Sequence, residues 1–182
     1  MAGADRLASL RPASIEDVVI AGTVYRVPAH AAFRWLETLL PDPVDLWEIV
    51  PGMLEPSATD AVIEELTQDR MTREDIINLG WELVSIAAGR PWWEAMNLIH
   101  FADDVQYGNY VWGQLALHGV DPTRVSLAAW LDAVYGVFTR NAHTAESRQK
   151  FDTSLATPPP GVTVKRDKAA TRRAMEAAMR SG

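Results

Sequence analysis

The sequence has 182 residues, of which 48% are hydrophobic, and it carries a formal net charge of −7 with no cysteine. This length suits one domain with a substantial core plus tails, and the lack of cysteine excludes a disulfide framework, a thiol nucleophile and a cysteine-containing zinc site. Residues 163–182 hold six Lys/Arg and two Asp/Glu, a local charge of +4, so the remainder carries −11, which argues against nucleic-acid binding by the body.

The first 14 residues contain arginines but no apolar stretch, so we expect a disordered segment over residues 1–14 and no signal peptide. The longest run without Asp, Glu, Lys or Arg covers residues 105–120. Polar residues and glycines interrupt this run, and it is shorter than the ~20 apolar residues of a membrane span. We therefore expect no contact with a membrane.

The predicted domain begins with a β-hairpin. β-branched residues at 18–20 and 23–27 flank Ala21-Gly22, and two such runs joined by a glycine-containing pair are typical of a hairpin. A lone hairpin is marginal in water, so it should pack on helices. Residues 30–40 follow as a helix, with apolar side chains three or four positions apart.

Two further helices are predicted next. Asp42 suits the cap and Pro43 the first position of a short helix, which the Pro-Gly pair at 51–52 should end. Ser57, with an acid three residues later, resembles a capping arrangement for an acidic amphipathic helix over residues 58–68.

Thr72 and Asp75 predict a capping box at the start of a helix over residues 73–88. Its apolar band is broad, so neighbours should contact this central helix from two sides. Gly89 suits the residue after a helix, and Pro91 suits the first position of the next one. The Gly-Arg-Pro triplet is therefore predicted to be a tight corner between two buried helices.

After this corner the apolar pattern weakens over residues 102–108 and resumes as far as Gly119. One bent helix and two consecutive helices both fit this pattern. Ser126 suits the cap of the last core helix, over residues 127–140. The fold class is mainly α: a compact domain of six or seven helices over residues 15–140, with the short hairpin at its start.

Beyond this domain the composition changes. Residues 141–162 contain a Pro-Pro-Pro-Gly run and are predicted to form a linker. Residues 163–182 form a flexible basic tail with a weak helical pattern, marginal on its own. Either the tail contacts protein or it stays solvated, and the lack of a nearby aromatic platform argues against nucleic acid.

No residue set in the sequence predicts catalysis. Phosphate-loop, dinucleotide-binding and nucleophile-elbow motifs do not occur, and the neighbours Glu64-Glu65 point in different directions on a helix. His100, Asp103 and Asp104 share a helix face that would suit a divalent metal. Because no second ligand set accompanies them, we interpret them as exposed residues and predict no enzyme, no cofactor and no metal site.

Seven tryptophans stand out in a chain of this length. Trp92 and Trp93 are consecutive, about 100° apart around a helix, so one of them must leave the main core. It either packs on the hairpin or the 30–40 helix, or it contacts a partner, and the candidate partner-binding residues are Arg90, Trp92, Trp93 and Met96. The other five lie on apolar stripes and are predicted to be in the core: Trp35, Trp47, Trp81, Trp112 and Trp130.

Four segments in order, DVVIAGTVYRVP, AAFRWLETL, GRPWWEAMNLI and HGVDPTRVSLAAWLDAVYGVF, resemble the tail assembly chaperones of long-tailed (siphovirus-type) bacteriophages infecting actinobacteria. The resemblance covers residues 16–140, and its most telling pieces are GRPWWEA and DPTRVSLAAWLDAV. It implies a small, helical, non-virion protein of the host cell cytoplasm. Such a protein binds the tape measure protein and keeps it soluble until tail tube subunits polymerise around it.

The resemblance also implies self-association, the tail tube protein as a second partner, and no catalytic residues. Many family members have a longer frameshifted product, and residues 141–182 lie where such products diverge. A holdase for a long helical client needs apolar surfaces on which amphipathic helices dock. The alternative function is a structural virion component, such as a tail terminator or connector protein.

Overall fold

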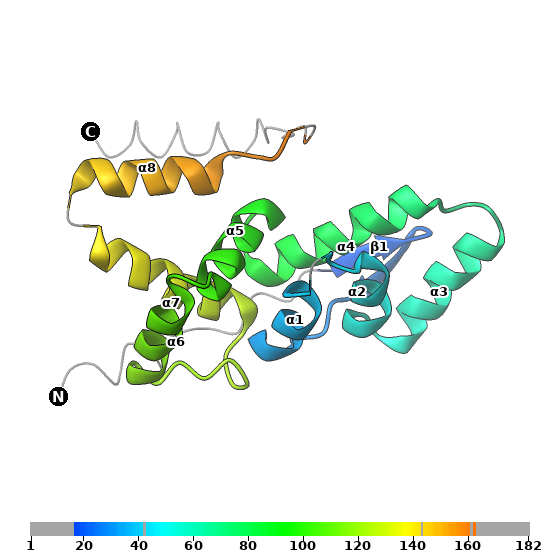
Figure 1. Ribbon diagram of the computed structural model, residues 1–182. Coiled ribbons are helices and arrows are strands. Elements are labelled where there is room, and N and C mark those ends of the chain that lie inside the picture. The colour runs from blue at the N-terminus through cyan, green and yellow to red at the C-terminus, as the bar shows by residue number, and fades with distance from the viewer. Residues whose placement is uncertain (1–16, 42, 143, 161, 163–182) are drawn as a thin grey trace, which may run out of the picture.

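The computed structural model describes residues 17–41, 43–142, 144–160 and 162. Within them the chain forms eight helices and one antiparallel hairpin, which confirms the mainly helical prediction (Figure 1). The predicted disordered segment 1–14 and basic tail 163–182 lie outside the described residues. The elements are β1 (Asp17–Ile20), β2 (Thr23–Arg26), α1 (Ala32–Leu39), α2 (Leu46–Met53), α3 (Pro56–Thr67), α4 (Arg73–Ala88), α5 (Trp92–Asp103), α6 (Gly108–Leu117), α7 (Leu127–Asn141) and α8 (Ala145–Ala156).

The hairpin forms as predicted and packs on a helix. Ala21 and Gly22 both have positive φ, 51° and 78°, as a two-residue turn of type I′ requires. Val18 and Ile20 are buried, and β1 contacts α3. The outer face carries the paired residues Val19 and Val24, both exposed.

The first helix is anchored by a distant loop. The N–H of Ala32 donates to the carbonyl of Val125 over 2.7 Å, and the N–H of Phe33 donates to that of Pro122 over 2.9 Å. These bonds satisfy donors that have no partner inside the helix. They attach α1 to the segment leading into α7, which α1 also contacts.

The sequence predicts the wrong start for both α2 and α3, and the wrong end for α2. The carboxylate of Asp45 caps α2 by accepting the N–H of Trp47 over 2.9 Å, whereas Asp42 lies outside the described residues. Pro51 lies inside α2 and does not end it. A proline near the end of a helix removes one hydrogen bond, and packing of α2 on α4 retains the last turn. Ser57 does not cap α3. The helix begins one residue earlier, at Pro56, so Ser57 lies inside its first turn.

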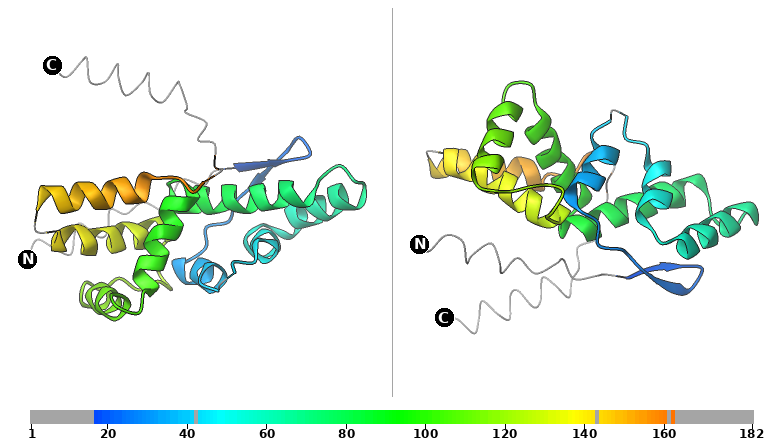
Figure 2. Two further views of the ribbon diagram at one scale, coloured as in Figure 1. Left: turned by 45° about the horizontal axis from the view of Figure 1, so that its top comes forward. Right: turned by 90° about the horizontal axis from the view of Figure 1, so that it is seen from below.

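The central helix matches its prediction from cap to cap. The Asp75 carboxylate accepts the N–H of Thr72 over 2.8 Å, and the Thr72 hydroxyl accepts the N–H of Asp75 over 3.2 Å. α4 contacts α2, α5 and α7, as a central helix should. Figure 2 shows it running along the molecule, with α2 and α3 beside one half and α5 crossing at its other end.

The ambiguous segment after α5 divides into two helices. The Asp104 carboxylate accepts the N–H groups of Gln106 and Tyr107 over 2.7 and 3.2 Å, and this turn separates α5 from α6. Ser126 caps α7 as predicted, accepting the N–H of Ala129 over 3.2 Å.

Part of the segment assigned to the linker is the helix α8, which packs on α5. Its amphipathic pattern is weak, because few of its residues are apolar. Phe151 lies 5.4 Å from Phe101 and 5.1 Å from Phe138 between ring centroids, and Leu155 is buried. These tertiary contacts stabilise a helix that the local sequence pattern does not predict.

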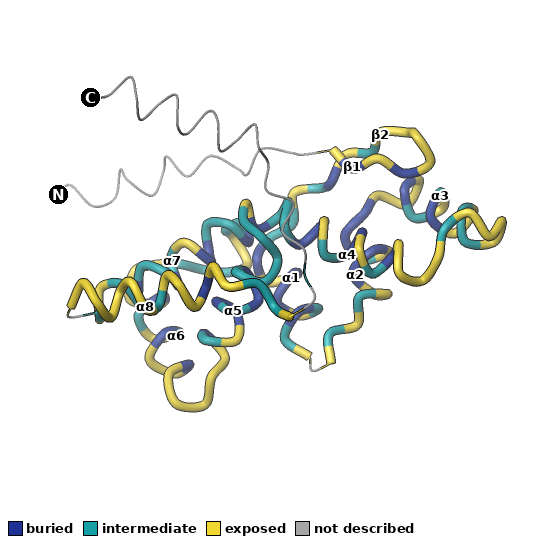
Figure 3. The backbone as a smooth tube through the Cα atoms, turned by 90° about the horizontal axis from the view of Figure 1, so that it is seen from above, coloured by how far each residue is buried: buried dark blue, intermediate teal, exposed yellow. Residues whose placement is uncertain are grey.

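Buried side chains form one core cluster that runs from the hairpin to α8, and Figure 3 shows the buried stretches alternating with exposed ones along the helices. The core prediction is confirmed for Trp35 and Trp130, which are fully buried. Trp81 and Trp112 are half-buried. For Trp47 the prediction is wrong, since 40% of this residue is exposed on α2.

Candidate functional site

The corner between α4 and α5 is formed by Gly89, Arg90 and Pro91. Gly89 has φ of 63°, a left-handed conformation that glycine adopts without steric cost. Its N–H donates to the carbonyl of Ile86 over 3.2 Å, and the N–H of Arg90 donates to that of Ser85 over 3.3 Å. The predicted tight corner is confirmed, with Pro91 one position before the first helical residue.

The hydroxyl of Ser85 joins the two helices. It accepts the N–H of Trp92, the first residue of α5, over 3.0 Å. The same hydroxyl donates to the carbonyl of Trp81 over 2.9 Å. One side chain of α4 thereby satisfies a donor at the start of α5 that no helical carbonyl can reach.

Three tryptophans gather at this corner. The rings of Trp81 and Trp92 are stacked, with centroids 4.2 Å apart and planes inclined by 18°. Trp93 meets Trp92 edge-on at 5.9 Å and 84°. All three are half-buried, so neither Trp92 nor Trp93 is fully in the core. Trp92 packs on Trp81 of α4, a partner that the sequence did not suggest.

Arg90 connects the corner to α7. Its Nη2 donates to the Asp132 carboxylate, while its Nε, like the Nε1 of Trp93, is buried without a hydrogen-bond acceptor among the described residues. Burial raises the pKa of the Glu94 carboxyl, and the positive charge of Arg90 partly opposes this rise. The corner thus combines aromatic surface with a cation held in place by α7.

The structure brings together three of the four predicted contact residues. Arg90, Trp92 and Trp93 lie at the corner, whereas Met96 is only 6% exposed and belongs to the core. Trp81 joins the cluster although its spacing predicts a core position. Its contact with Trp92 depends on the angle of the corner, which sequence spacing does not reveal. We call Trp81, Arg90, Trp92 and Trp93 the aromatic corner.

The alternative metal arrangement does not assemble. His100, Asp103 and Asp104 are exposed, and Asp104 already accepts two backbone N–H groups of the turn before α6. Among the described residues, no group of three or more His, Asp or Glu side chains is placed to hold a metal ion.

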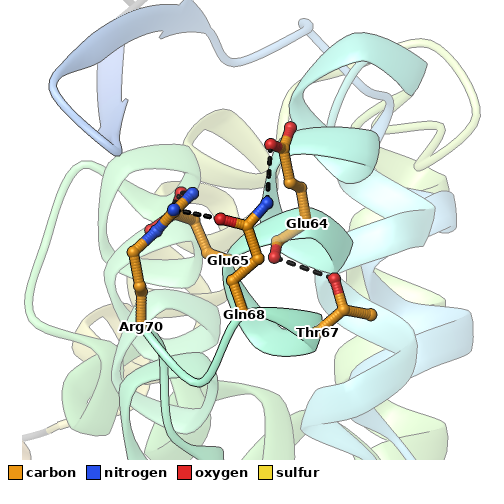
Figure 4. Close-up of polar contacts among 5 residues, drawn as sticks. All are labelled: Glu64, Glu65, Thr67, Gln68 and Arg70. Carbon is orange, nitrogen blue, oxygen red and sulfur yellow. Dashed lines mark hydrogen bonds and ion pairs between the residues drawn. The ribbon is translucent and has the colours of Figure 1, made fainter.

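The neighbouring residues Glu64 and Glu65 make polar contacts near the C-terminal end of α3 (Figure 4). Glu65 pairs with Arg70 over 2.5 Å, and the hydrogen bond from Arg70 lowers the pKa of the Glu65 carboxyl. Gln68 donates to the Glu64 carboxylate over 3.0 Å, and the Thr67 hydroxyl donates to the Glu64 carbonyl over 2.9 Å. These bonds order the chain between α3 and α4, and the two carboxylates have separate partners.

Comparison of the chain with protein families, curated proteins and solved structures finds no match. Within the described part of the chain, no helix has both the length and the apolar character needed to cross a membrane.

Proposed function

We propose that this protein is a phage tail assembly chaperone, which binds the tape measure protein and keeps it soluble in the host cytoplasm while the tail tube assembles. The observation that carries the proposal is the aromatic corner, a partly exposed cluster of three tryptophans and an arginine. Tryptophan and arginine are the residues most enriched at the energetic centres of protein interfaces. The sequence resemblance over residues 16–140 supplies the identity of the client.

The corner suits an apolar helical client. Trp92 is held by the Trp81 ring and by the Ser85 hydroxyl, so its position is set before any client binds. Such preorganisation reduces the entropy lost on association. An amphipathic helix of the client would place its apolar side chains against the indole rings.

The charge of the chain supports a solubilising role. Between residues 43 and 82 there are ten Asp/Glu and two Arg, so this stretch carries 2 − 10 = −8. Complexes that display this acidic surface repel one another, which opposes aggregation of the bound client. The same proposal includes the tail tube protein as a second partner and association of the chaperone with itself.

Co-expression of the full chain with a tape measure protein tests the proposal. Trp93→Ala and Trp92→Ala should reduce the soluble fraction of the client, because they remove the aromatic contact surface. Trp47→Ala is the matched control, since Trp47 is an exposed tryptophan on α2 and does not belong to the aromatic corner. Circular dichroism and thermal melting establish which variants are folded.

A folded Trp93→Ala variant that keeps the client as soluble as wild type would contradict the role of the corner. Mass spectrometry of purified particles distinguishes the chaperone from the alternative function, a structural virion component. A chaperone should be absent from them, whereas a terminator or connector protein should be present in a fixed copy number.

A further inference from the structure

The outward side of α6 carries no charged residue. Residues 105–120 contain no Asp, Glu, Lys or Arg, and the exposed positions of the helix fall on one arc of about 120° at 100° per residue. Tyr110 is 49% and Leu117 is 79% exposed, and the preceding turn adds the exposed Val105. A surface helix normally presents charged and polar residues to water. We call these exposed positions the α6 face: Asn109, Tyr110, Gly113, Ala116 and Leu117.

Gly113 lies in the middle of this face. A Cβ built at Gly113 meets no atom of the described residues within 4 Å, so none of them requires a glycine there. A glycine in a helix interior costs about 1 kcal/mol relative to alanine. Because the distance between packed helices depends on the side chains at their contact, a central glycine permits close approach of another helix.

The two ends of α6 carry opposite charges. Asp103 and Asp104 precede its first turn, and both are exposed. His118 follows its last residue, and the Nη1 of Arg140 lies 2.8 Å from the His118 Nε2. In an antiparallel pair of α6 helices, the acidic end of each copy meets the basic end of the other. The surface is therefore complementary to itself, as a two-fold symmetric interface must be.

We propose that a second copy of this chain occupies the α6 face, with the two α6 helices antiparallel and crossing near Gly113. Contacts through α2 to α4 would bring two strongly acidic surfaces together, since residues 43–82 carry ten Asp/Glu and two Arg. The α6 face lets two acidic chains meet through apolar side chains. This dimer rests on the proposed function, because it gives a specific surface to the self-association proposed there. Its contacts involve no client, so the mass of the chain alone tests the dimer separately from the client's solubility.

Light scattering and sedimentation of the full chain at micromolar concentration test the dimer. Wild type should have twice the chain mass of 20.1 kDa. Leu117→Glu places an acid beside the acidic end of the partner and should weaken association at least tenfold. The matched control is Ile63→Glu, an aliphatic residue on α3 that is 52% exposed, and it should leave the mass unchanged.

Charge reversal tests the antiparallel order. Asp103→Arg or Arg140→Glu alone should weaken the dimer, because each brings like charges together at both ends. The double variant should restore association, because both contacts again join opposite charges. A monomeric wild type, a folded Leu117→Glu variant that stays dimeric, or a double variant no better than the singles would overturn the proposal.

Discussion

Ser85→Ala is the sharpest perturbation of the aromatic corner, because one hydroxyl joins α4 to α5. The substitution removes the acceptor of the Trp92 N–H, which now lies 3.0 Å from the Ser85 Oγ. The Trp81 carbonyl also loses a donor, but within α4 it still accepts the helical N–H of residue 85. The effect should therefore come mainly from the N–H of Trp92.

The expected destabilisation follows from two opposing contributions. Leaving a partly buried N–H without its acceptor costs about 1–2 kcal/mol. Alanine favours a helix interior over serine by roughly 0.5 kcal/mol. The free energy of unfolding should fall by about 1 kcal/mol, which corresponds to a decrease in Tm of about 3 °C for a chain of this size.

Urea unfolding followed by tryptophan fluorescence measures this difference. Ser154→Ala is the control, because Ser154 is exposed on α8 and has the same gain in helix propensity without an interhelical bond among the described residues. It should be neutral or slightly stabilising. If Ser85→Ala proves as stable as Ser154→Ala, the hydroxyl does not hold the corner.

Three further changes test local features of the fold. Gly136→Ala should raise the free energy of unfolding in urea by about 0.5–1 kcal/mol, because a Cβ there meets no atom within 4 Å in α7; a loss would reveal hidden crowding. Ala21→Asn should add roughly 0.5–1 kcal/mol in the same assay, since asparagine tolerates the positive φ of this turn better than alanine; no gain would argue against strain. Thr72→Val should raise the pKa of Asp75, measured by NMR titration, because the hydrogen bonds from Thr72 hold it below the ordinary value of 3.8. Because the pKa of Asp75 is lower in the folded state than in the unfolded state, its ionised carboxylate stabilises the fold above pH 3.8. This stabilisation is lost as the pH falls through the folded-state pKa, so wild type should lose more stability in acid than the variant. An unchanged pKa of Asp75 in the variant would refute this.

Features that depend on neighbours in sequence were predictable. The capping box of Thr72 and Asp75, the left-handed Gly89 and the cap at Ser126 each use side-chain or backbone chemistry within four residues. Ala21-Gly22 likewise determines its own turn. Local hydrogen bonds and backbone preferences carry these elements, so a single sequence suffices to find them.

Features that depend on distant contacts were not predictable. Pro51 is tolerated because α2 packs on α4, and α8 is held by contacts of Phe151 with α5 and α7. The exposure of Trp47 follows from the side of α2 that faces α4. In each case tertiary packing outweighs the local pattern.

The aromatic corner was partly visible in the sequence. The spacing of Trp92 and Trp93 shows that both cannot enter one core, but it does not place Trp81 against Trp92 or Met96 in the core. The α6 face was visible only as a run without charge. Its meaning depends on which side of α6 faces water, and that requires the positions of α5 and α7.

The soluble fraction of the tape measure protein, expressed with and without this chain, tests the proposed function most directly. We expect the client to precipitate when expressed alone, and to remain soluble and co-purify with the chain when both are present. Equal precipitation in both cases, with the chain itself folded and soluble, would contradict the chaperone role.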